Sequence, residues 1–465
     1  MRLEPLLTAE ETRAAEEAYG GPLDELMERA GTAVADLVQR SFPGRVTVVC
    51  GGGNNGGDGK VCARVLREAG REVQVVDGVG DLGDPDVIVD ALLGIGLRDA
   101  PREDAARMIE LMNASRRPVV AVDVPSGVNA STGEVPGAAV RAAVTVTFGA
   151  AKVGLAVAPG RFHAGSVHVA PIGLRPAGHE NALVPASALA EVPPKRADST
   201  KYSAGAVLVV GGSRGLTGAP MLTALAAFRA DAGYVAVGAP ESTLPVLEAR
   251  LLEVVKRPLP EDAGGRLLPR SLDAILDAAE KADALALGPG LGRTEGTVEL
   301  VRLLLEQLDL PLVLDADALW ELEPFTRAAP TVLTPHSGEL SRLLGGQDVD
   351  VHRLDAVKRA AALFGSVVLL KGADTLVAAP RAGVLVCDYG TPALATAGSG
   401  DVLTGIVAAF LAKGMEAQRA AAAAAVAHGV ASSLVDPQRG AVASDLLPAL
   451  RLALAGHGWQ RAPLS

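Results

Sequence analysis

The chain has 465 residues, of which 49% are hydrophobic, and a formal net charge of -11. This length is too great for one hydrophobic core and predicts two or three domains, while a negative charge with no basic run argues against a nucleic-acid partner. The first residues lack a basic stretch followed by an apolar one, and no window approaches the roughly 18 apolar residues of a membrane span, so we expect a cytoplasmic protein with no membrane partner.

The first half of the chain reads as alternating helices and strands. Thr8 followed by Glu11 forms a capping-box pattern and predicts the start of a helix. Apolar residues at helical spacing over 23–38 predict a second, amphipathic helix. Short β-branched runs then predict strands at 46–49, 73–76, 87–89, 119–122 and 144–148. Because buried parallel strands read as continuous apolar runs, we expect an open α/β sheet.

The second half repeats this rhythm after an interruption. Residues 171–205 gather prolines and a polar run, so we place a boundary near residue 190, with domains at 1–190 and 191–465. Apolar runs predict further strands at 207–210, 284–287, 312–314, 332–333 and 367–370. A helix is predicted over 402–411, and the alanine-rich stretch 419–427 is predicted to be a buried helix. The second domain is therefore also α/β.

The most unusual segment is the glycine-rich run GGGNNGGDG at 51–59, directly after a predicted strand. Its Gly51-x-Gly53-x-x-Gly56 spacing fits a dinucleotide fingerprint, and Asp77 lies where a ribose-binding acid belongs, so a dehydrogenase is one interpretation. A ligand-free turn is the other, although glycine costs entropy that ordinary turns avoid. A Walker A loop is excluded, because Lys60, directly after this segment, is followed by Val61 and not by the serine or threonine that such a loop requires.

Carboxylates at neighbouring strand ends indicate a different ligand. Asp90 and Asp123 stand where strands end, and Asp58 follows another strand, so all three are expected at one edge of the sheet. They would repel a bare pyrophosphate, whereas a cation held by oxygens of Asn55, Asp90 and Ser126 would fit. The alternative for Asp123 is a local turn hydrogen bond. The three cysteines lack CxxC spacing, which argues against disulfides or a zinc site.

Four segments of the first half resemble the NAD(P)H-hydrate epimerase domain: GGGNNGGDG at 51–59, DALLGIGL at 90–97, VDVPSGVNASTGEV at 122–135 and TFGAAKVGL at 147–155; LMERAGTAVA at 26–35 resembles its N-terminal helix. The resemblance implies a Rossmann-like fold, a potassium ion and interconversion of the two epimers of hydrated NADH and NADPH. Gly52 and Ser131 depart from the family's usual proline and aspartate.

Carried onto this sequence, the resemblance implies roles for particular residues. Potassium would be held by Asn55, Asp90 and Ser126. Asp123 would be the acid/base, because a hydroxyl that leaves and returns beside a ring nitrogen needs a proton delivered and removed. The hydrated nucleotide would lie along two segments, Asn54, Asn55, Gly56, Gly57 and Asp58, and Gly94, Ile95, Gly96, Leu97, Arg98, Asp99 and Ala100.

In the second half, AGSGDVLTG at 397–405 offers free backbone N–H groups at a helix N-terminus beside the carboxylate of Asp401. This layout suits phosphoryl transfer to a hydroxyl, with Asp401 activating the acceptor. The alternative is an ordinary aspartate in the first turn of a core helix. Lys371 closes a predicted strand and begins KGADT, which is similar to a nucleotide-binding loop.

Six segments resemble NAD(P)H-hydrate dehydratase of the ribokinase-like superfamily: VLVVGGSRGLTGAP, LALGPGLG, VLDADAL, LTPHSGELSRLLG, LLKGADTLV and TAGSGDVLTGI. The resemblance implies that ADP, with magnesium, phosphorylates the hydroxyl of the hydrate and that phosphate then leaves. It also assigns the sites. The adenine nucleotide would contact Lys371, Gly372, Ala373, Asp374, Thr375, Gly398, Ser399 and Gly400, and the hydrate would contact Gly290, His336 and the catalytic Asp401.

Some residues depart from this second family pattern. Trp320 replaces a usual asparagine, Ser337 replaces a proline, and Thr391–Ala393 replace Asn-Pro-Gly. His336 also has an alternative role as a helix cap. The expected protein is a homo-oligomeric repair enzyme that epimerises the hydrates and dehydrates the S epimer, yielding AMP and phosphate. Two alternatives stay open: a vitamin-precursor kinase with a regulatory nucleotide-binding first half, and a first half that is only a binding or scaffold module.

Overall fold

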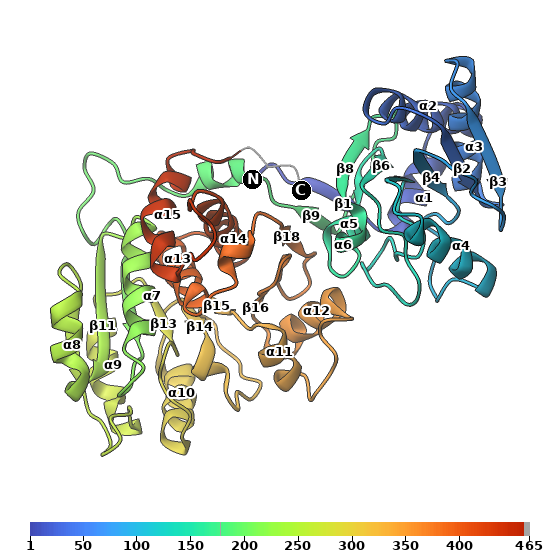
Figure 1. Cartoon of the computed structure of the whole chain (residues 1–465). Coiled ribbons are helices and arrows are strands. Elements are labelled where there is room, and N and C mark those ends of the chain that lie inside the picture. Colours follow the sequence, from blue (N-terminus) through green and yellow to red (C-terminus); the bar gives the residue numbers. More distant parts are fainter. Residues whose placement is uncertain (177, 460–465) are drawn as a thin grey trace. The chain divides into compact units, whose positions relative to one another are not determined.

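The computed structural model describes residues 1–176 and 178–459 (Figure 1). The chain divides into two compact units. Of the described residues, the N-terminal unit is built mainly from Glu4–Leu183, and the C-terminal unit from Met1–Leu3, Val184–Val349 and residues 355–459. In Figure 1 the first runs from blue to blue-green and the second from green to red. Both units are α/β, as the sequence predicts.

The N-terminal unit contains a six-stranded parallel sheet in the order β3-β2-β4-β5-β6-β8. Its strands are β2 (Val46–Cys50), β3 (Val73–Asp77), β4 (Val87–Ala91), β5 (Val119–Val122), β6 (Val144–Phe148) and β8 (Ser166–Ala170). The chain moves from β2 to β3 on one side and then returns to β4 on the other. This reversal makes the carboxyl ends of β2 and β4 the switch point at which open sheets bind ligands.

Helices cover both faces of this sheet, as a fully buried parallel sheet requires. Helices α2 (Leu23–Ser41) and α3 (Asn54–Glu68) pack on one face with Val48 and Val89, and α4 (Glu103–Ala114) packs on the other with Val49 and Ile88. Neighbouring strand residues thus point to opposite faces, the period of two expected of a strand. The remaining elements are short: β1 (Glu4–Leu7), α1 (Ala9–Glu17), β7 (Ala151–Lys152), α5 (Val153–Ala156), α6 (Arg161–Ala164) and β9 (Asn181–Leu183).

The C-terminal unit is organised around strands in the order β12-β11-β10-β13-β14-β15-β16-β17-β18. They are β10 (Ala206–Val210), β11 (Tyr234–Pro240), β12 (Val255–Leu259), β13 (Ala284–Leu287), β14 (Leu312–Leu314), β15 (Thr331–Leu333), β16 (Val367–Leu370), β17 (Thr375–Ala378) and β18 (Leu385–Cys387). Pairing is parallel as far as β16 and antiparallel at β17 and β18. The strand order reverses between β10 and β13, which makes a second switch point.

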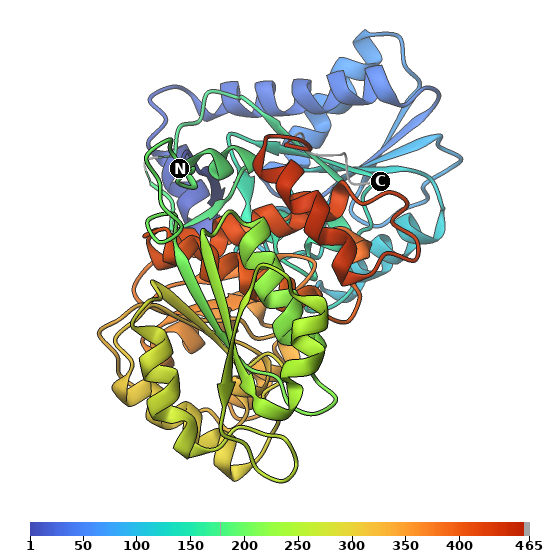
Figure 2. The ribbon, with the colours of Figure 1, turned by 90° about the vertical axis from the view of Figure 1, so that its left-hand side faces the viewer.

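Helix α13 (Ser399–Ala412) lies at the centre of this unit and is buried from its fourth residue to its end. It packs against α7 (Gly218–Arg229), α14 (Ala417–Ser433) and the strands β10 and β13. Figure 2 shows green strands between α7 and the yellow helices. The other helices are α8 (Leu244–Arg250), α9 (Leu272–Ala279), α10 (Glu295–Gln307), α11 (Ser337–Leu343), α12 (Arg353–Phe364) and α15 (Leu446–Leu454).

Most predicted elements are confirmed. Helix α1 starts after Thr8, whose side chain and that of Glu11 form the expected capping box. The ten predicted strands are present within one or two residues, and α14 is buried as predicted. The sequence analysis missed β11, although its run YVAVGAP is apolar, together with short strands such as β1, β7 and β9. Within the described ranges, no helix combines the length and apolar character that crossing a bilayer requires.

Two candidate active sites at sheet switch points

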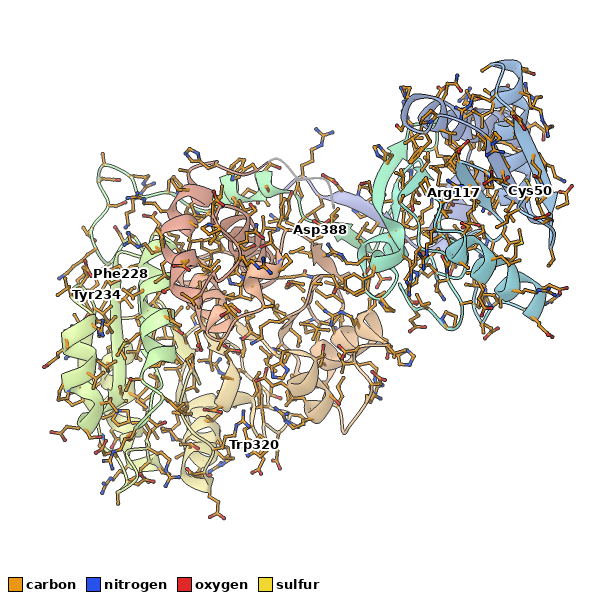
Figure 3. All side chains as sticks on the ribbon, in the orientation of Figure 1. Cys50, Arg117, Phe228, Tyr234, Trp320 and Asp388 are labelled. Carbon is orange, nitrogen blue, oxygen red and sulfur yellow. The ribbon has the colours of Figure 1, made fainter. Side chains whose placement is uncertain are left out.

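The glycine-rich loop of the N-terminal unit is built by close backbone approach. Strand β2 ends at Cys50, labelled in Figure 3, and α3 begins at Asn54. A Cβ atom on Gly51 would lie 2.0 Å from the carbonyl oxygen of Leu92, and one on Gly56 would lie 1.9 Å from that of Gly51. Side chains are therefore excluded here, because the loop folds tightly between the ends of β2 and β4.

Asn55, Asp90 and Ser126 meet around the backbone of Leu93. The Asn55 amide donates to the Leu93 carbonyl at 2.9 Å, and the Leu93 N–H donates to Ser126 Oγ at 2.8 Å. Ser126 in turn donates from Oγ to Asp90 Oδ1 at 2.6 Å and from its backbone N–H to Oδ2 at 2.8 Å. The structure thus brings all three residues into one buried oxygen-rich network, although Asn55 lies in the first turn of α3, Asp90 in β4 and Ser126 in the loop after β5.

Asp90 is fully buried, and burial raises its pKa against the opposing effect of the hydrogen bonds from Ser126 and Leu92. In the part of the chain that the structure describes, no lysine or arginine forms an ion pair with it, and no three His, Cys, Asp or Glu side chains cluster as a metal site would require. A buried carboxylate without a cationic partner costs free energy, and burial accordingly favours the neutral form of Asp90.

Asp123 belongs to a separate polar cluster beside this network. It follows β5 with φ +64°, a left-handed conformation that is uncommon outside glycine. Its Oδ1 atom accepts hydrogen bonds from Lys152 Nζ at 2.5 Å, from Thr147 Oγ1 at 3.0 Å and from the Phe148 N–H at 3.3 Å. Oδ2 accepts none from the described residues. The carboxylate of Asp123 is therefore held in place through one of its two oxygens.

Asp58 and Glu16 lie in the electrostatic field of Asp123. Burial, and next the negative charge of Asp123, raise the pKa of Asp58 to about 8, while Lys152 opposes the rise. The pKa of Glu16 is also raised, by burial first and by Asp123 second. Two like-charged groups that share a site avoid ionising together, so Asp58 is protonated near neutral pH while Asp123 is paired with Lys152.

The second predicted nucleotide segment of this unit lies between β4 and α4. Gly94 lies against Asn55, because a Cβ on this glycine would be 3.1 Å from the Asn55 Cβ. Ile95 packs on a small core that includes Val124, whereas the residues from Arg98 to Ala100 are exposed. The start of the segment, at Gly94, thus lies beside the oxygen-rich network, and its end, from Arg98 to Ala100, is exposed to solvent.

The C-terminal unit places Lys371 at the N-terminus of α13. A Cβ on Gly400 would lie 3.3 Å from Lys371 Nζ, so the ammonium group reaches the first turn of the helix. Gly398 precedes this turn with φ +91°. The first N–H groups of a helix have no intrahelical partner and carry its positive dipole end. An ammonium group beside helix N–H groups is an arrangement suited to binding an anion.

Asp315, which follows β14, ties this site together. Its Oδ1 accepts from Lys371 Nζ at 2.8 Å, and its Oδ2 accepts from Thr404 Oγ1 at 2.6 Å. Burial lowers the pKa of Lys371, but Asp315 and then Glu339 outweigh it, so the net shift is upward and the lysine stays charged. Burial, and next Asp315, raise the pKa of Asp401 to about 7, against the opposing charge of Lys371. Asp401 is thus poised to gain or lose a proton near neutral pH.

The other predicted residues of the second site occupy neighbouring loops. Lys371, Gly372, Ala373 and Asp374 form the connection between β16 and β17, and Thr375 is the first residue of β17. Gly290, in the loop after β13, has φ +68°. His336 caps α11, because its Nδ1 atom accepts from the N–H of Gly338 at 3.0 Å, and its side chain remains 58% exposed. His336 therefore acts as a helix cap, the alternative role considered from the sequence, while its ring remains exposed.

Several residues of the two sites were not identified from the sequence. Lys152 and Asp315 stand inside motifs that the sequence analysis quoted, but their partners are distant in the chain. His428 on α14 lies near Ser399, and burial lowers its pKa to about 4, so its ring is neutral at pH 7. The one available signal was chemical: a lysine inside the apolar run VTVTFGAAKVGLAV is an unusual residue to bury.

Comparison with known protein families covers both units. The model of the family described as NAD(P)H-hydrate dehydratase matches residues 207–451, and that of the YjeF-related protein N-terminus matches residues 23–80 and 76–154. A bifunctional NAD(P)H-hydrate repair enzyme of Moorella thermoacetica is 39% identical over 95% of this chain and 94% of its own length. The repair enzyme of the same description from Escherichia coli K12 is 36% identical over 94% and 91%.

Solved structures resemble the C-terminal unit. The ADP/ATP-dependent NAD(P)H-hydrate dehydratase of Bacillus subtilis, co-crystallised with ATP and Mg²⁺, is 29% identical with a TM-score of 0.52, covering 59% of this chain and 96% of that one. A ribokinase-like superfamily protein of Enterococcus faecalis is 25% identical with a TM-score of 0.52, covering 60% and 97%. The predicted ribokinase-like fold of the second domain is thereby confirmed.

Proposed function

The chain belongs to the family of bifunctional NAD(P)H-hydrate repair enzymes, and from this premise we propose that each unit carries one of the two activities. The N-terminal unit would interconvert the epimers of hydrated NADH and NADPH at Asp123. The C-terminal unit would convert the S epimer back to NAD(P)H at Asp401, at the expense of ADP. The domain boundaries that we propose, 1–190 and 191–465, correspond to this division of labour.

In the N-terminal unit, epimerisation requires that the hydroxyl beside the ring nitrogen leaves and returns on the opposite face. We assign proton delivery and removal to Asp123 and Asp58. A proton transferred to the hydroxyl lets it depart as water while the ring nitrogen supplies the electron pair, and a carboxylate takes a proton back when water adds again. The free Oδ2 atom of Asp123 and the raised pKa of Asp58 support this pairing of a base with an acid.

The glycine-rich loop and the segment starting at Gly94 would then bind the hydrate beside these carboxyl groups. The nucleotide contacts that we propose are Asn54, Asn55, Gly56, Gly57 and Asp58, and Gly94, Ile95, Gly96, Leu97, Arg98, Asp99 and Ala100. Their position at the switch point between β2 and β4 supports the assignment.

Potassium fits the network of Asn55, Asp90 and Ser126. The atoms that would coordinate the ion are side-chain oxygens of Asn55, Asp90 and Ser126, the kind of ligand that a hard cation prefers. The Asp90 carboxylate has no ion-pair partner among the described side chains. A bound cation there would supply positive charge that organises the glycine-rich loop and attracts the anionic dinucleotide. With or without a bound cation, Asn55 and Ser126 hold the loops together through hydrogen bonds to the backbone of Leu93.

In the C-terminal unit, we assign Asp401 as the base that removes the proton from the hydroxyl of the hydrate. The oxygen then attacks the terminal phosphorus of ADP, and AMP departs. Lys371 and the N–H groups of Gly400 and its neighbours stabilise charge on the transferred group. In the next step the C–O bond breaks with its electron pair on phosphate, and a proton from the neighbouring ring carbon is lost, which restores the ring. Magnesium would assist by neutralising phosphate charge.

The ADP contacts that we propose are Lys371, Gly372, Ala373, Asp374, Thr375, Gly398, Ser399 and Gly400, and the hydrate contacts are Gly290, His336 and Asp401. The observation that carries this assignment is the meeting of Lys371, Asp315 and Asp401 at the start of α13. A phosphoryl donor and a hydroxyl acceptor need this combination of a cation, helix N–H groups and a base.

The test is an assay that resolves the two epimers. A mixture of hydrated NADH epimers is supplied with ADP and Mg²⁺, and the absorbance of reduced nicotinamide and the release of inorganic phosphate are followed. We expect recovery of NADH from both epimers with one phosphate released per NADH. A stably phosphorylated product without recovery of NADH would instead favour a small-molecule kinase. Replacing ADP by ATP in a parallel reaction decides which nucleotide is the donor.

A further inference from the structure

Two arginines of the C-terminal unit converge on one tryptophan. The guanidinium carbon of Arg293 lies 4.7 Å from the centre of the Trp320 ring, and that of Arg342 lies 5.4 Å from it. Arg293 comes from the loop after β13, Trp320 from the loop after β14 and Arg342 from the last turn of α11. We call these three residues the cationic cluster. Figure 3 labels Trp320 in the lower part of this unit.

The cluster is unevenly neutralised. Arg293 donates from Nε to Asp317 at 2.8 Å, and the N–H of Gly292 donates to the same carboxylate at 2.9 Å. Arg342 is exposed, and no carboxylate of the described residues lies within ion-pair distance of it. The cluster therefore contains two positive charges, of which Asp317 neutralises only that of Arg293. The Trp320 ring attracts both guanidinium groups, and that of Arg342 keeps its N–H donors for an anion.

The loop that carries Trp320 is held in an uncommon conformation. Ala316 and Glu321, on either side of the short turn that contains Asp317, both have positive φ, at +51° and +53°. Residues other than glycine rarely adopt this conformation, and its cost is often found at binding sites. The half-buried indole is thus placed by its backbone, not only by packing. Since both Asp315 and Asp317 act on the pKa of Asp401, the loop also belongs to the surroundings of the proposed base.

We propose that the cationic cluster of Arg293, Trp320 and Arg342 is a subsite that binds a phosphate group of the hydrated dinucleotide. The proposal rests on the proposed function, because it identifies the anion as part of that substrate. The chain has a net charge of -11, so a polyanionic substrate needs local positive charge beside the acids of this site. Arginine is suited to this task, because its planar donors match the oxygens of a phosphate group.

Two phosphate sources are chemically equivalent at this cluster: the pyrophosphate present in both hydrates and the 2′-phosphate present only in the NADPH form. A binding experiment that needs no turnover distinguishes them. The chain has two tryptophans, so Trp459→Phe leaves Trp320 as the sole reporter. Inorganic pyrophosphate and 2′-AMP are titrated separately, and the emission of Trp320 is followed. We expect a saturable change with at least one probe, and the probe that responds identifies the source.

Arg342→Gln is the matched variant. In the Trp459→Phe background it should weaken binding of the responding probe about tenfold, as expected for the loss of one charge-assisted hydrogen bond. Arg302→Gln is the control, because Arg302 is an exposed arginine of α10 that pairs with Glu299 and Glu306. Emission that does not respond to either probe, or a response that Arg342→Gln leaves unchanged, would overturn the proposal.

The kinetic experiment uses the full chain. Arg342→Gln should raise KM for the hydrates about tenfold. The rise should occur with both hydrates if pyrophosphate binds and with the NADPH hydrate alone if the 2′-phosphate binds. KM for ADP should change less than about twofold. A rise in KM for ADP alone would show that the cluster binds ADP and not the hydrate, and would overturn the proposal. If the wild-type chain does not turn over any hydrate, the proposed function fails, while the fluorescence titration still decides whether the cluster binds phosphate.

Discussion

The ammonium group of Lys152 lies 2.5 Å from Oδ1 of Asp123, although the lysine side chain is fully buried. Its other contacts are Thr147 Oγ1 and the Phe148 carbonyl, both at 3.0 Å, so all three ammonium protons have acceptors. A buried lysine is stabilised only when it is paired in this way. The pair therefore fixes the orientation of Asp123 through Oδ1, and the described residues donate no hydrogen bond to Oδ2.

Lys152→Met should impair both stability and epimer exchange. Removing one partner of a buried ion pair leaves the other uncompensated, and we expect the free energy of unfolding to fall by about 3 kcal/mol. Because Asp123 would lose its orientation, epimer exchange should slow on the order of 100-fold while dehydration of the S epimer continues. Urea denaturation and the epimer-resolved assay measure the two effects. Lys60→Met, which removes an exposed lysine paired with Asp77, should change neither by a comparable amount.

The double variant Lys152→Met with Asp123→Asn tests whether the loss of stability arises from the unpaired charge of Asp123. Removing the orphaned carboxylate should restore a large part of the lost stability, since the cost arises from an unpaired buried charge. It should not restore epimer exchange. If the double variant were as unstable as the sum of the two single variants, the pair would not act as a unit.

Asp58 should make the free energy of unfolding depend on pH in a predictable direction. Its pKa is about 8 in the folded chain and 3.8 in the absence of structure, so between these values the folded state binds more protons than the unfolded state. The free energy of unfolding therefore falls as pH rises from about 4 to about 8. Asp58→Asn should remove part of this slope. Denaturation curves at several pH values for both chains decide it, and an identical slope would show that Asp58 is not buried beside Asp123.

Asp401→Asn should abolish dehydration while epimer exchange persists, because the two sites lie in different units. In the wild type, dehydration under subsaturating hydrate should increase with pH through about 7, the value near which Asp401 loses its proton. The measurement is the rate of NADH recovery against pH, with epimer exchange followed in the same samples. Loss of both activities in a folded Asp401→Asn chain would argue against two independent sites.

The Thr404 hydroxyl provides a test of the positioning of Asp315. Thr404→Val keeps the shape of the side chain but removes the donor to Oδ2 of Asp315, and we expect a loss of about 2 kcal/mol of stability. Thr404→Ser keeps the hydroxyl and should retain more stability and dehydration activity than valine does. Equal behaviour of the two variants would mean that the 2.6 Å hydrogen bond has no role in the site.

Potassium should stabilise the chain through Ser126. At constant ionic strength, exchanging choline for potassium should raise the melting temperature of the wild type, because a ligand that binds only the folded state stabilises it. Ser126→Ala removes one proposed oxygen and the donor to Asp90, and should reduce that rise. Ser115→Ala, at the end of α4, is the control. A potassium response that Ser126→Ala leaves intact would place the cation elsewhere.

Local structure was largely predictable from the sequence. The capping pair Thr8 and Glu11 and the apolar runs of the ten strands predicted elements that the structure confirms. Such patterns can be recognised because the spacing of apolar residues along the sequence matches the repeat of a buried helix face or strand. The predicted strands also placed Asp90 and Asp123 at the carboxyl ends of β4 and β5, where ligands bind in open α/β sheets. Edge strands such as β7, with two residues, leave too short a pattern to be recognised.

The amino-acid order by itself determined the two α/β series, the glycine-rich loop and the kinds of chemical groups at the strand ends. The pairing of those groups was decided only in three dimensions: Lys152 meets Asp123 across 29 residues, and Asp315 joins Lys371 and Thr404 across 56 and 89. The physical reason is that periodicity records which side of an element is buried, whereas an ion pair or a shifted pKa depends on which distant groups share one low-dielectric space.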